Sequence, residues 1–353
     1  MGLFSKLFGC KKNKNNYSIS VEIHSASEQI PQYQGDYAKT IFLYKHSKAM
    51  TLKKNDEYQK FFLYELGIRN PRKYHLELIK QGLLIESNLN DKLEALTVNQ
   101  LKSLMNDLNI TVSGAKSRLI EKAKHSDNVG TIIDKFYNSQ PYSLSEKGAQ
   151  FINEHNHYIL LWKHKNWSIN WKEYDEIARL TQYKKSFYDV VWGIFNKRAM
   201  NSTNFGYYEY INMYELLCEE NKIPEALQIL LLILSLDVSG TIYQPPFQSY
   251  FYKLISKQEL IEKTNVAISE YYIKELPKYK KYIDFKIIDK CYNDKLPIQI
   301  CDKDLFTEII TEGVNETIDL KKYNLILTEN YKKQIPFIIK NKNLCRFLGL
   351  KVD

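Results

Sequence analysis

The chain has 353 residues, of which 44% are hydrophobic and 26% charged, and its formal net charge is +9. This composition excludes a disordered protein and predicts two or three domains, each with its own core. The positive charge favours polyanionic partners such as nucleic acid. The abundance of Tyr, Lys, Asn and Ile, with only 9 Pro, is typical of coding by an AT-rich genome, and we therefore expect a bacterial or phage source.

Cysteine spacing and hydropathy exclude further classes of protein. The five Cys residues are widely spaced and contain no C-x-x-C pair, which argues against a disulfide framework and against a zinc ribbon. The most apolar run, residues 229–236, is far shorter than the ~20 residues that span a bilayer. Because the N-terminus has no convincing secretory signal either, we expect a cytoplasmic protein without a membrane partner.

Residues 1–16 form a basic amphipathic tail in the sequence pattern, with Leu3, Phe4, Leu7 and Phe8 followed by several lysines. Lys6 stands where the N-myristoylation pattern requires Ser or Thr, so a frayed tail is favoured over a membrane anchor. Residues 17–95 are predicted to be partly helical. Within them, residues 17–58 are expected to be irregular or partly strand, and a helical pattern returns from residue 57 to residue 84, where Asn70 is suited to cap a helix that begins at Pro71.

Residues 96–124 carry the clearest pattern in the chain. Thr97 is suited to cap a first helix, and Asn109 is suited to end it in the left-handed conformation. An extended bridge over residues 110–112 leads to a second helix, which Ser113 and Gly114 open. The inward positions of the two helices are apolar at helical spacing: Leu101, Leu104, Met105, Leu108, Leu119, Ile120 and Ala123.

The order of residues in this segment resembles a SAP domain, a helix-extended-helix module that binds nucleic acid. The resemblance implies sequence-tolerant binding, often to AT-rich duplex DNA, with the second helix and its preceding turn against phosphates. The nucleic-acid-binding residues that it implies are Lys102, Ser113, Gly114, Lys116, Arg118, Lys122 and Lys124. This chain departs from the family at Ala123, where a larger Leu is common, and at Lys122, where Arg is common.

Two stretches that flank the SAP-like segment, Gly82-Leu83-Leu84 and residues 142–148, resemble the recognition-helix and wing edges of a winged helix. Because the SAP-like segment lies between them and breaks the usual order, we give this resemblance little weight. We interpret Ser145 instead as the cap of a helix that runs through Phe151 and Ile159 to Trp162.

The region 142–242 is predicted to be helical and contains a recognisable hairpin at residues 208–238. Tyr210, Tyr214 and Leu217, a turn at residues 220–222, and Pro224 entering an apolar helix resemble one hairpin of the tetratricopeptide type. No second copy appears at the required spacing, so a repeat array is not predicted. The helix-breaking stretch 243–246 predicts an internal boundary, followed by a C-terminal helical region at residues 247–353. We therefore expect a mainly α, multi-helical fold: a SAP-like module plus a helical scaffold.

Motifs that carry chemistry are not evident. The stretch Gly114-Ala115-Lys116-Ser117 lacks the glycine five residues earlier that a phosphate loop needs, because Asn109 stands there. His155, His157 and His164 do not have the spacing of a zinc pair. We therefore predict no enzyme, no cofactor and no metal. The lysine-interleaved aromatic residues at 162–198 and 271–282 suit stacking on single-stranded bases, although aromatic residues at helical spacing are more often core.

The sequence thus predicts a nucleic-acid-binding protein whose partner is DNA, with RNA as the other nucleic acid to consider and another protein as a further partner. The main alternative is a protein-interaction adaptor that uses the helical hairpin, in which the SAP-like segment is structural. A third possibility is a DNA-processing enzyme with an unrecognised site.

Overall fold

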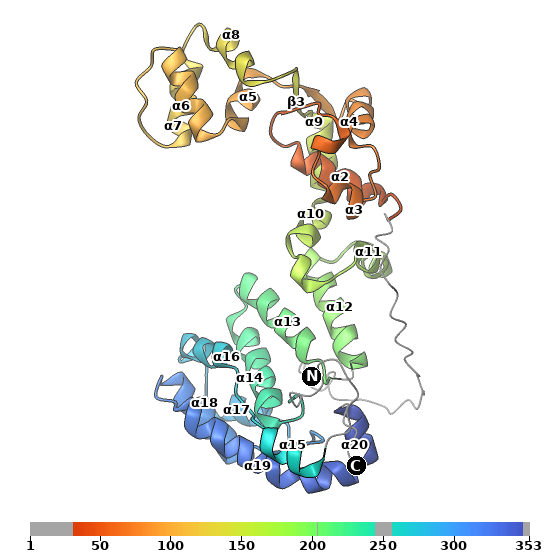
Figure 1. The fold of residues 1–353 in the computed structure, drawn as a ribbon, viewed down its shortest axis with the longest axis vertical. Coiled ribbons are helices and arrows are strands. Elements are labelled where there is room, and N and C mark those ends of the chain that lie inside the picture. The colour runs from red at the N-terminus through yellow and green to blue at the C-terminus, as the bar shows by residue number, and fades with distance from the viewer. Residues whose placement is uncertain (1–30, 203, 244–255, 349–353) are drawn as a thin grey trace. The chain divides into compact units, whose positions relative to one another are not determined.

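The computed structural model describes residues 31–202, 204–243 and 256–348, which form two compact units (Figure 1). We call them the N-terminal unit, residues 31–172, and the C-terminal unit, residues 173–348. Both are mainly helical, as the sequence predicts. The predicted tail at residues 1–16 lies outside the described residues. Within these limits, no helix is both long and apolar enough to cross a bilayer.

The N-terminal unit begins with helices and short strands that enclose an aromatic core. Their order is α2 (Gly35–Lys45), β1 (Met50–Thr51), the 3-10 turn η1 (Asn55–Glu57), α3 (Phe61–Tyr64), α4 (Pro71–Lys80) and β2 (Leu84–Glu86). Asn70 caps α4, since its Oδ1 accepts a hydrogen bond from Lys73 N at 2.9 Å, and Pro71 is the first helical residue, as predicted. The prediction of irregular structure for residues 17–58 is wrong at α2, whose buried residues Ile41, Phe42 and Leu43 form a continuous run that hides the helical period.

The sheet has three antiparallel strands in the order β1-β3-β2, where β3 is Pro141–Leu144. Leu84 pairs with Leu144, and Tyr142 pairs with Glu86 on one side and Met50 on the other. The elements follow one another in the order α2, β1, α3, α4, β2 and β3. This order, together with the strand order of the sheet, resembles the arrangement of a winged helix. The SAP-like segment therefore does not break that order, because it is inserted between two strands that still pair. We call residues 87–140 the inserted lobe.

The inserted lobe is larger than the predicted module. It contains α5 (Leu89–Ala95), α6 (Val98–Asp107), α7 (Lys116–Lys124), α8 (Val129–Ile133) and η2 (Asp134–Phe136) (Figure 1). One core joins all four helices, with Leu93, Leu104, Leu119 and Ile133 among its buried residues.

The two ends of the inserted lobe are fastened beside the sheet. Ser143 Oγ donates to Asp91 Oδ2 at 2.6 Å, and Ser87 N donates to the Pro141 carbonyl at 2.9 Å. Lys92 Nζ lies 2.6 Å from Asp134 Oδ1, which joins the start of the lobe to its end.

Two helices, α9 (Glu146–Glu154) and α10 (Asn156–Lys163), follow the sheet and lead to the 3-10 turn η3 (Lys165–Trp167). Ser145 caps α9 as predicted, because Gly148 N donates to its Oγ at 2.9 Å. The predicted single helix to Trp162 is interrupted at His155, whose φ of −111° and ψ of 23° are not helical.

The C-terminal unit is built around a long apolar helix, α14 (Ile223–Ser239), which is buried almost throughout. It forms the predicted hairpin with α13 (Tyr207–Glu219), joined at Asn221 in the left-handed conformation with φ of 55°. The other elements of the unit are α11 (Trp171–Leu180), which begins at the end of the N-terminal unit, α12 (Phe187–Asn201), α15 (Lys257–Lys263), α16 (Glu270–Glu275), η4 (Leu276–Tyr279), α17 (Phe285–Cys291), α18 (Lys303–Val314), α19 (Leu320–Lys340) and α20 (Lys342–Phe347).

The predicted domain boundary at residues 243–246 is wrong. Helices on both sides of it belong to one unit, and the division of the chain falls between residues 172 and 173. Ser269 N donates to Asp237 Oδ2 at 2.6 Å, and Ile300 N donates to the Ser239 carbonyl at 3.1 Å.

Candidate nucleic-acid interface

The first helix of the SAP-like segment, α6, has the termini that the sequence predicts. Thr97 and Gln100 form a reciprocal capping box, in which Gln100 N donates to Thr97 Oγ1 at 3.3 Å and Thr97 N donates to Gln100 Oε1 at 2.9 Å. Asn109 follows the helix with φ of 56°, in the left-handed region. The buried side of α6 carries Leu101, Leu104 and Met105, so the opposite side faces solvent.

The turn before α7 differs slightly from the prediction. The helix begins at Lys116, with Ala115 at the N-cap position, rather than at Ser113. Gly114 has φ of 107°, and an added Cβ would lie 2.7 Å from Arg118 Cδ, so glycine is required here for its backbone. Ala115 has no side chain that can cap the helix, and no other side chain among the described residues does so. The first amides of α7 therefore remain available to an anion, which the helix dipole favours at this end.

The basic residues that the SAP resemblance selects fall into two groups. We call Lys102, Arg118 and Lys124 the outward group, because all three side chains are exposed. Within the described residues, Lys102 and Arg118 make no ion pair, while Lys124 Nζ lies 3.7 Å from Glu121 Oε2.

We call Lys116 and Lys122 the anchored group, because their ammonium groups bind the protein itself. Lys116 Nζ donates to the Glu94 carbonyl at 2.7 Å. Lys122 Nζ donates to the Thr111 carbonyl at 3.1 Å and to Ser113 Oγ at 3.0 Å, which places Ser113 against this lysine. Hydrogen bonds to neutral oxygens leave the positive charge of both lysines uncompensated, so the anchored group fixes the turn and still adds to the positive potential.

A second basic face, on α4, was missed by the sequence analysis. Its core side holds Pro71, His75 and Leu78, and the residues that face solvent are mostly basic. We call the exposed residues Arg72, Lys73 and Lys80 of α4, together with Arg69 just before the helix, the α4 face. Lys73 Nζ lies 4.0 Å from Glu77 Oε1, and Arg72 Nη1 donates to the Lys53 carbonyl at 3.0 Å. The signal that would have found it is the pairing of the short strands on either side of the lobe.

The α4 face is backed by a buried histidine pair. The rings of His46 and His75 lie 4.5 Å apart between centroids, and Tyr58 Oη is 2.9 Å from His75 Nδ1. Burial lowers the pKa of His46 to about 4, and burial together with the neighbouring His46 lowers the pKa of His75 to about 3. Both rings are therefore neutral at pH 7 and belong to the core behind α4.

No family model, no curated protein and no solved structure matches the chain.

Metal-binding geometry is lacking in the parts of the chain that the structure describes, where no three His, Cys, Asp or Glu side chains converge. The three neighbouring histidines of the sequence have other contacts. His155 Nδ1 is 2.9 Å from the Phe151 carbonyl, and His164 stacks on Trp167 at 3.9 Å between centroids. Burial is the larger cause, and the electrostatic influence of His155 the smaller cause, of a lowered pKa of His157, which is about 4.

Proposed function

We propose that the protein binds duplex DNA through the inserted lobe, in a sequence-tolerant manner. The observation that carries this proposal is the outward group, which places exposed positive charge on α6 at Lys102, on the first turn of α7 at Arg118 and on its last turn at Lys124. Lysine and arginine contacts to phosphates supply affinity that is independent of sequence. The SAP resemblance implies the same partner and favours AT-rich duplex.

The anchored group has a different role in this proposal. Lys122 holds the 111–113 turn, and Lys116 ties α7 to the end of α5. Both lysines position the turn and the first amides of α7 against a phosphate. They act mainly through the structure of the lobe, whereas the outward group contacts the ligand.

The winged-helix arrangement supports the same class of partner. In that family the helix before the wing is the recognition helix, and its counterpart here is α4. The α4 face is basic, with Glu77 as its single exposed acid. We therefore propose the α4 face as a second contact with the same duplex.

The test uses the full chain with two sets of substitutions. The first replaces the outward group (Lys102→Gln, Arg118→Gln and Lys124→Gln), and the second replaces the anchored group (Lys116→Gln and Lys122→Gln). The matched control changes three exposed lysines of the C-terminal unit, Lys197, Lys321 and Lys340, to Gln. Binding of a fluorescent AT-rich duplex and a GC-rich duplex of equal length is measured at several salt concentrations, beside a thermal melt.

We expect the outward variant to bind both duplexes more weakly, with an unchanged melt. Each lost phosphate contact should reduce the log-log salt slope by roughly 0.9, or by two to three units for the group. The anchored variant should lose about 1 kcal/mol of lobe stability as well as affinity. If the outward variant binds as tightly as the parent, or if the parent shows no salt-dependent binding, the adaptor alternative replaces this proposal.

A further inference from the structure

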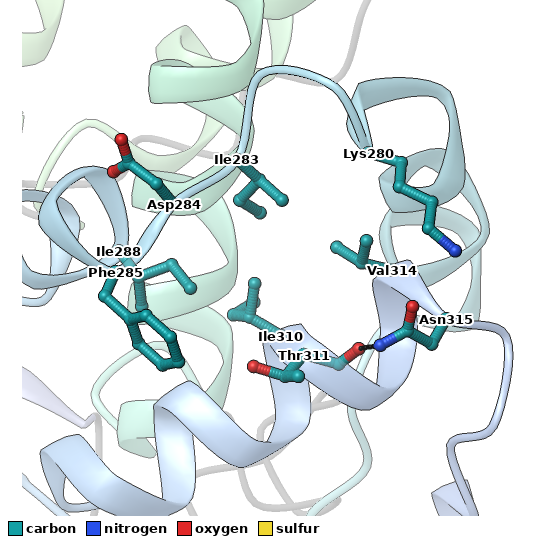
Figure 2. A pocket seen from close by; sticks show the side chains of 9 residues that line it. All are labelled: Lys280, Ile283, Asp284, Phe285, Ile288, Ile310, Thr311, Val314 and Asn315. Carbon is teal, nitrogen blue, oxygen red and sulfur yellow. Dashed lines mark hydrogen bonds between the residues drawn. The ribbon is translucent and has the colours of Figure 1, made fainter.

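A groove lies on the C-terminal unit, between the loop 280–284, α17 and α18. Its volume is about 220 Å³. Apolar side chains form its floor, and Figure 2 shows Ile283, Ile310 and Val314 pointing toward one another across the opening. Lys280 and Phe285 lie at opposite ends of it.

The aromatic residues around this groove are divided between core and surface. Tyr272 and Tyr279 are buried, whereas Tyr282 is 49% exposed and Phe285 is 74% exposed. The sequence stretch 271–282, in which aromatic residues alternate with lysines, therefore contributes some rings to the core and presents others to solvent. Phe285 therefore extends the apolar surface of the groove into solvent with an exposed ring.

The charges beside the groove are mainly positive. Lys280, Lys281 and Lys286 are exposed, and none of them makes an ion pair within the described residues. The acid on the rim, Asp284, caps α17, because its Oδ1 accepts a hydrogen bond from Ile287 N at 2.9 Å. The more distant Lys303 is paired with Asp289 and adds little net charge.

The rim also offers polar groups that suit the edge of a base. Asn315 Nδ2 donates to the Thr311 carbonyl at 3.0 Å, which fixes the amide and leaves its Oδ1 facing away from that bond (Figure 2). Thr311 places its hydroxyl on the same rim. An acceptor and a hydroxyl next to an apolar floor match the mixed polar and apolar character of a nucleobase.

We propose that this groove binds single-stranded nucleic acid, with one base stacked on Phe285 above the apolar floor and the flanking phosphates on Lys280, Lys281 and Lys286. Aromatic rings and lysines in alternation are the combination that holds single strands, because every base has a face to stack and every linkage has a charge. This activity goes beyond duplex binding by the inserted lobe and does not require it.

The test uses the full chain with the outward group already changed to Gln, so that binding by the inserted lobe is weakened. The probe is oligothymidine of about 16 nucleotides, the upper end of common site sizes, with one 2-aminopurine that reports stacking. Phe285→Ala and the triple Lys280→Gln, Lys281→Gln and Lys286→Gln change the groove. Phe337→Ala, which removes a ring that is 57% exposed on α19, and the triple at Lys197, Lys321 and Lys340 are the controls.

We expect Phe285→Ala to raise the Kd for the oligonucleotide about tenfold and to abolish the change in 2-aminopurine fluorescence. The groove lysine triple should weaken binding and reduce its salt dependence. Neither control should do so, and every melt should match that of the parent, since the altered side chains are exposed. Binding that is absent, or that is insensitive to Phe285→Ala, overturns the proposal. A change in oligomeric state on Phe285→Ala overturns it as well, because the groove would then be an interface between copies of this chain.

Discussion

His46 and His75 show how one titratable pair can set the acid stability of the N-terminal unit. Both residues are fully buried, and the Nε2 atom of each has no hydrogen-bond partner among the described residues. His46 Nδ1 lies 2.6 Å from the Phe42 carbonyl, and Lys53 is the nearby cation that further disfavours a charged His46. A proton added to either ring would therefore enter an apolar and partly cationic environment.

We expect the N-terminal unit to lose stability as the pH falls below about 6.5. Because the folded pKa values, about 4 and about 3, lie below the unfolded value of 6.5, the unfolded chain binds more protons in acid. The contribution of the two neutral histidines to the free energy of unfolding is fully present above pH 6.5. At pH 5 this free energy is lower by about 2 kcal/mol for each histidine. Urea unfolding, followed by tryptophan fluorescence between pH 8 and pH 5, measures this loss.

His75→Gln provides the control for this titration. It removes one of the two titrating groups. The slope of the unfolding free energy against pH should therefore correspond to the uptake of about one proton instead of two. Because three of the four tryptophans, Trp162, Trp167 and Trp171, lie in the N-terminal unit, the fluorescence mainly reports on that unit. An unfolding free energy in the parent that is equal at pH 7 and pH 5 would contradict the prediction.

At the residue scale, sequence reasoning succeeds where chemistry is local and fails where a side chain has a choice of partners. Thr97 and Asn109 act within one helical turn, and both were predicted correctly. Lys122 carries the expected charge, but its long side chain can reach either solvent or the Thr111 carbonyl. Only the fold determines which oxygen lies within reach, and this explains why the outward and anchored groups could not be separated beforehand.

At the element scale, the inserted lobe depends on the contact between α6 and α7. Leu104 and Leu119 are fully buried in a core of few residues. Because such a small core has little capacity to rearrange, a cavity in it should remain largely unfilled.

We expect Leu119→Ala to destabilise the inserted lobe by about 2 to 5 kcal/mol. DNA binding should be lost only because the lobe unfolds, so that the affinity should recover in a stabilising osmolyte. Val98→Ala, at a residue that is 43% exposed on α6, is the control and should change stability by less than about 0.5 kcal/mol. Hydrogen exchange of α6 and α7 amides measures the effect. Unchanged protection in Leu119→Ala would show that the two helices do not share a core.

The elements that the sequence missed have physical reasons for being missed. The strands are two to four residues long, too short for an alternating pattern to develop. Their pairing links Leu84 to Leu144 across the whole inserted lobe. Local patterns cannot report such a contact, so the helices of the SAP-like segment were predicted while the sheet that carries them was not.

At the scale of the whole molecule, the N-terminal unit consists of a part that contains the sheet and of the inserted lobe, which interrupts it between β2 and β3. Residues 88–140 can be replaced by an Asn-Gly turn, because Ser87 and Pro141 already face each other as neighbours in the sheet. We expect this excised chain to fold and to keep the tryptophan fluorescence of the parent.

The excised chain should bind duplex DNA more weakly than the parent and with a smaller salt slope, because only the α4 face remains. Changing Arg69, Lys73 and Lys80 to Gln in the same chain should then abolish the remaining binding, and fluorescence anisotropy measures both steps. Complete loss on excision alone would show that α4 makes no contact. Affinity equal to that of the parent would remove the inserted lobe from the proposed function.

The attachment of the lobe at both ends couples its folding to that of the sheet. While the lobe is folded, strands β2 and β3 are joined by what behaves as a short loop. Once it unfolds, pairing of the same strands must close a flexible loop formed by residues 87–140. The additional entropic cost of closing this loop is a free energy of about 2 kcal/mol. Any ligand that keeps α6 and α7 folded therefore also strengthens strand pairing at the sheet, by up to that amount. Occupancy of the lobe thus becomes measurable at β2 and β3, which the ligand need not touch.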